Sequence, residues 1–142
     1  MIEEMTKIEL AERQLRRAVL LFMNEEDYIS ATTLAGAADG ILEQYVKRRG
    51  DRTALEREVE ILEDLYEPND APPPGGNWFN LLRFPQNELK HFSRPEQETI
   101  TANFCEDAKE VLNRALWNYY LLHGKHFKEA LVYLRHLGDV SS

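Results

Sequence analysis

The amino-acid sequence predicts an all-α fold, most simply an up-down bundle of five or six helices. Apolar residues recur at steps of three and four along most of the chain, which is the period of an amphipathic helix. Capping residues and glycines separate these segments, and no stretch alternates in the way that a strand does. The length of 142 residues suits one domain with a buried core, so we expect a single helical domain over residues 1–142.

Residues that typically begin or end a helix mark the boundaries of the first three predicted helices. Apolar positions at helical spacing extend over residues 2–23, and Asn24 is expected to cap a second helix within residues 27–49. Thr53 and Glu56 have the spacing of a capping box, in which each side chain accepts a hydrogen bond from the other residue's backbone N–H. This pair predicts that a third helix begins there.

Prolines shape the middle of the chain. Residues 67–76 hold four of the six prolines and two of the seven glycines, which predicts an exposed, mobile loop. Asn77 is then expected to cap a short helix over residues 78–84. Pro85 should kink or break this helix, because proline has no backbone N–H and its ring collides with the preceding turn.

Two more helices complete the expected fold. Ser93 and Glu96 have capping-box spacing and predict the longest helix, residues 95–122, which Gly124 ends. This long helix carries apolar residues on one side, as a bundle requires. A last amphipathic helix is expected over residues 126–137.

The charge of the chain limits its partners. With 17 basic and 25 acidic residues the net charge is −8, so the surface as a whole repels nucleic acid, and any RNA must bind at a small local site. The longest apolar run, residues 18–23, is too short to cross a bilayer. A single cysteine cannot build a disulfide framework. We expect a cytoplasmic protein that does not enter a membrane.

The histidines do not have the spacing of a metal site. His123 and His126 are separated by Gly124, which ends the helix. Residues 88–91 supply only one of the Glu-x-x-His pairs that a di-iron bundle repeats. We therefore expect no metal and no cofactor. Cys105 is followed by two acidic residues, which favours an inert, at least half-buried thiol over a nucleophile.

Two further features have both a structural and a functional interpretation. Small residues crowd residues 30–40, where they either let another helix pack closely or line a ligand slot between helices. The basic cluster over residues 46–52 either stabilises a helix C-terminus through its dipole or binds phosphate. Close packing and the dipole are the simpler explanations.

Residues 81–92 form the strongest candidate site. On a continuous helix Arg83, Asn87 and His91 would lie along one stripe, because they are four residues apart. Histidine exchanges protons near neutral pH, and arginine can hold a phosphate through two hydrogen bonds. The alternative is a solvated polar helix face. The residues that we expect to bind RNA or phosphate are Arg83, Gln86, Lys90 and Arg94.

Two parts of the chain resemble the HEPN superfamily of small all-α domains. Residues 11–22 and 27–47 resemble its first helical hairpin, and residues 85–91 resemble the segment with its Arg-x(4–6)-His signature. The resemblance implies a homodimer in which the arginine and histidine of two subunits meet across the interface. Active members cleave RNA there without a metal, and the substrate's own 2′-OH is the nucleophile.

Carried over to this chain, the resemblance matches Asn87 to the polar residue after the motif arginine and His91 to the motif histidine. Both side chains would then be partly exposed beside their symmetry mates. Gln86 stands in the place of the arginine, and glutamine has no charge to stabilise a phosphate transition state. The resemblance therefore implies a site geometry with a lost or weakened activity. The basic residues that could replace the missing cation are Arg83, Lys90 and Arg94.

Three functions are consistent with these patterns. The first is a HEPN-like homodimer, inactive or weakly active, that binds protein or RNA, for example beside a nucleotidyltransferase in a toxin–antitoxin or defence system. The second is a metal-independent endoribonuclease that uses His91. The third is a tetratricopeptide-like scaffold, because residues 25–31 and 124–130 each place an aromatic residue three positions before an alanine. We favour the first, in which any enzymatic activity is lost or weak.

Overall fold

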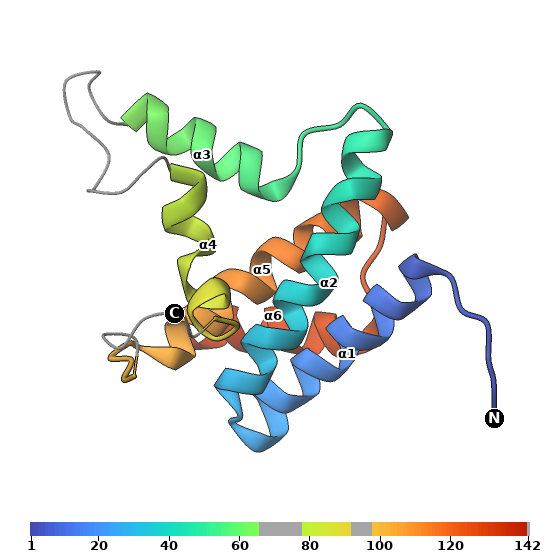
Figure 1. Cartoon of the computed structure of the whole chain (residues 1–142), viewed down its shortest axis with the longest axis horizontal. Helices are drawn as coiled ribbons and strands as arrows, with labels where there is room; N and C mark the ends of the chain where they lie inside the picture. The colour runs from blue at the N-terminus through green and yellow to red at the C-terminus, as the bar shows by residue number, and fades with distance from the viewer. Residues whose placement is uncertain (66–77, 92–97, 142) are drawn as a thin grey trace.

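Helices make up the fold, which is known from a computed structural model that describes residues 1–65, 78–91 and 98–141. Within these ranges there are six helices and no strand, which confirms the all-α prediction of five or six helices. Figure 1 shows α1 and α2 as an antiparallel hairpin with α5 and α6 behind it. The helices are α1 (Lys7–Glu25), α2 (Tyr28–Arg48), α3 (Ala54–Leu65), α4 (Trp78–Glu88), α5 (Phe104–His123) and α6 (Lys128–Ser141).

The hydrophobic core lies where α1, α2, α5 and α6 meet. Each helix contributes apolar side chains at helical spacing, and a fully buried aliphatic side chain stabilises a fold by about 1.5–3 kcal/mol. The Phe22 and Tyr133 rings pack edge to face with centroids 5.3 Å apart and join α1 to α6. The fully buried leucine and valine side chains of this core are Leu15, Val19, Leu42, Val111, Leu112 and Leu116.

The helices α3 and α4 flank this four-helix core. Figure 1 shows α3 crossing one end of the molecule and α4 descending beside α2. The capping box predicted at the start of α3 is confirmed: Thr53 Oγ1 accepts from Glu56 N at 3.1 Å, and Glu56 Oε1 accepts from Thr53 N at 3.3 Å. The helix packs on both α4 and α5, so α3 connects the core to α4.

The junction of α1 and α2 differs from the sequence prediction. Asn24 lies inside α1, and Asp27 caps α2 instead, because its Oδ1 accepts from Ser30 N at 3.2 Å. Glu26 between them takes a left-handed conformation with φ 52°. A two-residue connection of this kind turns the chain sharply, and α1 starts only after Thr6, later than the periodicity predicts.

The start of α5 is a second correction. The helix begins at Phe104, where Asn103 Oδ1 accepts from Glu106 N at 3.1 Å, and not at residue 95. Residues 98–103 are not helical, and the predicted capping pair Ser93 and Glu96 lies outside the described residues. At the other end the prediction is confirmed, because Gly124 with φ 70° ends the helix.

Of the two predicted effects of Pro85, a kink or a break, the break does not occur. The helix continues from Trp78 to Glu88, and Leu89 N still donates to Pro85 O at 3.4 Å. A proline inside a helix costs about 3 kcal/mol, so the packing of this helix on α2 has to offset that cost. The expected cap Asn77 and the predicted loop 67–76 lie outside the residues that the structure describes.

Close packing explains most of the small-residue segment of α2. Ala31, Ala35 and Ala38 are fully buried in the core. Gly36 faces α4, where a Cβ atom on the glycine would lie 3.1 Å from Gln86 Cβ. Gly40 has no neighbour within 4 Å of such an atom, so packing gives no reason for this glycine.

A helix that spans a membrane must be both long and predominantly apolar. Among the residues that the structure describes, no helix is both long enough and apolar enough to span a bilayer.

Candidate functional site

The candidate site residues on and just after α4 do not all face the same way. Arg83 and Gln86 turn toward α2, whereas Asn87 and His91 are exposed. A helix advances 100° per residue, so position 87 lies only about 40° around the helix from position 83. The ion pair with Glu43 turns the Arg83 side chain toward α2, and among the described residues no hydrogen bond or ion pair joins Arg83 to Asn87 or His91.

Arg83 is held by an acidic residue of α2. Its Nη2 donates to Glu43 Oε1 at 3.2 Å, and the Glu43 carboxylate is largely buried. A guanidinium that is neutralised by a carboxylate has little capacity left for a phosphate group. Arg83 thus holds α4 on α2, which is a different role from the phosphate binding that its sequence position suggests.

Gln86 occupies the position of the motif arginine and is buried. Its Cβ and Cδ atoms lie against Gly36, and its Oε1 accepts no hydrogen bond among the described residues. A buried amide oxygen without a donor costs stability, which sets this residue apart from an ordinary packing residue. Gln86 can bring neither a charge nor an exposed donor to a substrate on the outer side of α4.

A buried polar network lies behind α4 and connects three elements. Asn118 Nδ2 donates to Asp39 Oδ1 at 2.6 Å, and Asn118 Oδ1 accepts from Ala54 N at 2.8 Å. Burial raises the pKa of Asp39 from 3.8 to about 6, against the opposing effects of the Asn118 hydrogen bond and the Arg114 charge. The network fixes the start of α3 on α2 and α5.

Arg114 extends this network to α4. Its side chain is almost fully buried, and its Nε donates to Glu58 Oε1 at 3.3 Å. Its Nη2 donates to the Leu82 carbonyl oxygen at 3.3 Å. One buried arginine of α5 therefore binds both α3 and α4, and with the Arg83–Glu43 pair it determines how α4 is oriented.

These network residues were not singled out from the sequence. A signal was present: Asp39 and Glu43 are four residues apart, as are Arg114 and Asn118, and each pair lies among apolar core positions of its helix. Polar residues at core positions of a helical period indicate a buried network.

The exposed side of α4 carries the candidate catalytic residues. Phe84, Asn87 and His91 lie on it at helical spacing, and Lys90 is exposed beside them. His91 follows the end of the helix, but its N–H still donates to Asn87 O at 3.2 Å, so the last turn keeps His91 close to Asn87. Arg94 lies outside the described residues.

The single cysteine lies beside a cavity of about 370 Å³ between α2, α5 and α6. Cys105 is partly buried, which confirms the predicted burial, and its neighbours in the cavity include Tyr28, Lys109 and His136. Burial raises the pKa of the Tyr28 hydroxyl, and the nearby Cys105 thiol adds to this effect. No ligand chemistry is specified by this set of residues.

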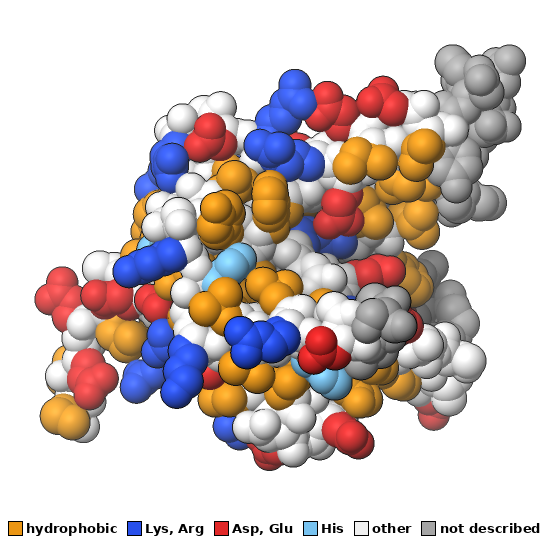
Figure 2. All heavy atoms as spheres, turned by 180° about the vertical axis from the view of Figure 1, so that it is seen from behind, with side chains coloured by type: hydrophobic (Ala, Val, Ile, Leu, Met, Phe, Trp, Pro, Cys, Tyr) orange, Lys and Arg blue, Asp and Glu red, His pale blue; other side chains and the backbone are white. Residues whose placement is uncertain are grey.

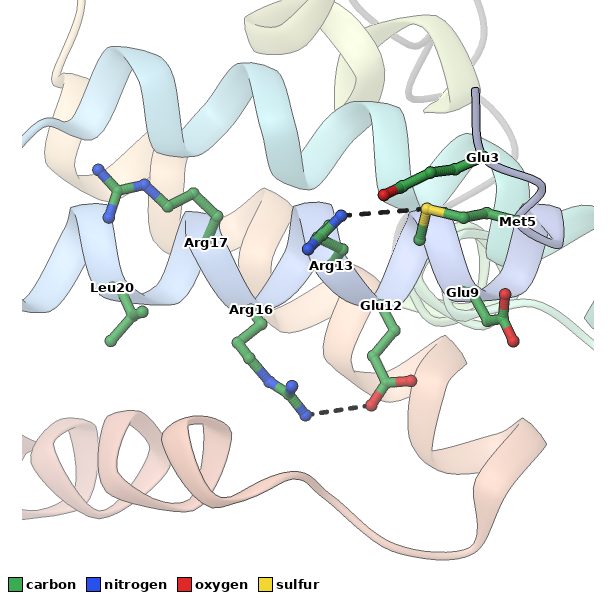
Figure 3. Close-up of a pocket in the computed structure, with 8 residues that line it drawn as sticks. All are labelled: Glu3, Met5, Glu9, Glu12, Arg13, Arg16, Arg17 and Leu20. Atoms are coloured by element: carbon green, nitrogen blue, oxygen red, sulfur yellow. Dashed lines mark hydrogen bonds and ion pairs between the residues drawn. The ribbon is translucent and has the colours of Figure 1, made fainter. Parts of the chain in front are cut away.

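A larger and more open cavity of about 540 Å³ lies along α1 and is drawn in Figure 3. Arg16 bonds Glu12 at 3.2 Å on one side of the helix, and Arg13 contacts the Met5 sulfur at 4.0 Å on the other. The three arginines of the cavity are matched by three glutamates, so it carries no excess charge for an anion.

No metal centre occurs in the described part of the chain, where no group of three or more His, Cys, Asp or Glu side chains could hold an ion. Comparisons with protein-family models, with curated proteins and with solved structures find no match to this chain.

Proposed function

We propose that this chain is a HEPN-like binding module without ribonuclease activity that self-associates through the exposed side of α4. The observation that carries this proposal is the position of Gln86. It replaces the motif arginine, it is buried on Gly36, and Arg83 beside it is neutralised by Glu43.

Cleavage of RNA by its own 2′-OH develops negative charge on a pentacoordinate phosphate. A site that accelerates this step needs a cation or several donors within hydrogen-bond distance of that charge. On the outer side of α4, the described residues offer His91, Asn87 and the flexible Lys90. A single exposed lysine is a weak substitute for a fixed guanidinium, which supports binding without catalysis.

Self-association is supported by the apolar residues next to the motif. Phe84 is 57% exposed and Leu81 is also exposed, both on the short helix that carries Asn87 and His91. The adjacent helix α3 exposes Ile61 and Leu65 as well. Exposed apolar side chains gathered on neighbouring elements are typical of an interface, and a two-fold axis near α4 would place two His91 side chains close together.

An RNA-cleavage assay tests the loss of activity. Labelled single-stranded RNA is incubated with the wild-type protein, with His91→Ala and with His136→Ala, which removes an exposed histidine of α6 as a matched control. We expect the same background with all three proteins. Cleavage that is lost only with His91→Ala would instead support the metal-independent endoribonuclease.

A protein partner fits a module that acts by binding. Affinity purification from the native host tests this, and a co-purifying nucleotidyltransferase would support a toxin–antitoxin or defence role. A chain that always purifies without a partner would count against it. The tetratricopeptide alternative gains no support from the fold, because α1, α2, α5 and α6 close around one shared core.

A further inference from the structure

Three aromatic rings and a guanidinium form a row on the outer side of α5. The Trp117 and Tyr120 rings stack with centroids 6.0 Å apart, and Tyr120 stacks on His126 at 5.1 Å. The Arg57 guanidinium lies 5.9 Å from the Trp117 ring centroid. Trp117 is 42% exposed and Tyr120 41% exposed, so two large rings of this row face solvent.

The surroundings of the row are basic in a chain of net charge −8. Residues 45–57 contain five basic and two acidic residues, a net charge of +3, and residues 111–128 contain the exposed Lys125 and Lys128 and no acidic residue, since Arg114 is buried and paired with Glu58. The two segments are in contact, because Arg49 Nη1 donates to the Leu121 carbonyl oxygen at 2.9 Å. The Arg49 side chain therefore bonds the C-terminal end of α5, while its backbone N–H caps its own helix, α2.

Carboxylates do neutralise part of this charge. Arg49 pairs with Asp51 at 3.5 Å, and Arg52 pairs with Glu60. Among the described residues, no ion pair involves Arg57 at one end of the row or Lys125, which precedes His126 in the sequence. Figure 2 shows orange side chains in the upper part of the face turned to the viewer, with both blue and red side chains along its upper edge. Two exposed aromatic rings and the Arg57 guanidinium lie together in the row.

We propose that this row, Arg57, Trp117, Tyr120 and His126, is a binding surface for single-stranded nucleic acid. Unpaired bases stack on exposed aromatic rings, and phosphates are attracted to the guanidinium and ammonium groups beside them. The basic residues beside the row supply the charge complementarity that the rest of the acidic surface lacks. A duplex hides the faces of its bases, so the surface should prefer single strands.

The surface combines Trp117 and Tyr120 of α5 with Arg57 of α3 and His126 after α5, and it contains no residue of α4. The inference therefore goes beyond the proposed function and does not depend on self-association or on the resemblance that supports it. A protein that does not self-associate through α4 would still carry this row. A negative result in the binding experiment below would in turn say nothing about the α4 interface.

Fluorescence anisotropy with labelled 12-nucleotide uridine and deoxythymidine oligomers, and with a 12-base-pair duplex, tests the surface. We expect Trp117→Ala to weaken binding of the single strands about tenfold, since a stacked base contributes about 1–3 kcal/mol. Trp117→Phe should retain most of the affinity and controls for folding. Arg57→Ala should weaken binding and reduce its salt dependence, whereas Arg13→Ala on α1 should not.

The two oligomers show whether the surface distinguishes RNA from DNA. Equal affinity for the two oligomers assigns the surface to base stacking alone, and tighter binding of the uridine oligomer assigns it to RNA. Either result supports the surface. It would be overturned if the wild-type protein bound no oligomer at low salt, bound the duplex more tightly, or bound single strands equally well after Trp117→Ala.

Discussion

Gln86 packs directly on Gly36, where a Cβ atom on the glycine would lie 3.1 Å from Gln86 Cβ and 3.3 Å from its Cδ. This contact turns one side of α4 into a packing surface and leaves Asn87 and His91 on the other side. As a result, Gln86 is buried, whereas Asn87 and His91 of the same motif segment are exposed.

Two glycines of α2 give opposite predictions. Gly36→Ala should destabilise the fold by about 1–3 kcal/mol, because Gln86 Cβ is fixed close to the backbone of α4 and cannot swing away. Gly40→Ala meets no atom within 4 Å, so the helix propensity of alanine should stabilise the fold by up to about 1 kcal/mol. Urea unfolding of both variants measures the difference. Stabilisation by both substitutions would show that α4 does not approach Gly36 this closely.

The buried carboxyl of Asp39 makes stability depend on pH. Folding raises its pKa from 3.8 to about 6, mainly through burial, so the protonated form contributes stability at low pH that is lost as pH rises through about 6. Asp39→Asn keeps an acceptor for Asn118 without the charge and should stabilise the protein by about 2 kcal/mol at pH 7.

Urea midpoints measured from pH 4 to pH 7.5 check this prediction. The advantage of Asp39→Asn over the wild type should be small at pH 4, grow toward pH 6 and then level off. Asp64→Asn, an exposed position of α3, controls for the change in net charge. An advantage that is the same at every pH would contradict a titrating Asp39.

Arg114 should matter more for the placement of α4 than for the core. Arg114→Met removes the hydrogen bonds to Glu58 and to the Leu82 carbonyl oxygen and should cost about 2 kcal/mol. The backbone of residues 81–84 should then exchange its amide hydrogens faster, whereas the core of α1 and α2 should not. Arg13→Met, at an exposed position of α1, is the control. Uniform acceleration across all helices would show that Arg114 is an ordinary core residue.

The helices themselves were predictable from the sequence, but the residues at which they begin were less so. Asn24 and Ser93 are good caps by type, yet Asp27 and Asn103 perform this role. Several Asn, Asp, Ser and Thr residues precede each helix, and local preferences among them differ by less than the packing energy that selects one. Thr53 was predicted correctly because Glu56, three residues later, completes a capping box, and Gly124 because glycine readily takes the left-handed conformation that ends a helix.

The candidate site was predictable only as a set of residues on one helix. Spacing alone placed Arg83 and His91 on one stripe, but Glu43 of α2 and Gly36 decide which side of α4 faces inward. Glu43 lies 40 residues from Arg83 in the sequence, and Gly36 lies further still from Gln86, so no local pattern contains these partners. The buried charge of Arg114 likewise depends on tertiary partners in α3 and α4.

Self-association through α4 is the most direct requirement of the proposed function. Phe84→Glu places a charge on the exposed side of this helix, and Leu131→Glu places one on α6, at a residue of similar exposure, 52% against 57%. The charge at Phe84 should disrupt the interface at least tenfold, because a buried unpaired carboxylate is costly, and the control should not.

Light scattering at micromolar concentration is the decisive measurement. The wild type and Leu131→Glu are predicted to have twice the 16.6 kDa mass of one chain, and Phe84→Glu the mass of one chain. A wild-type protein that stays at the mass of one chain would contradict self-association. So would a Phe84→Glu variant that remains at twice that mass.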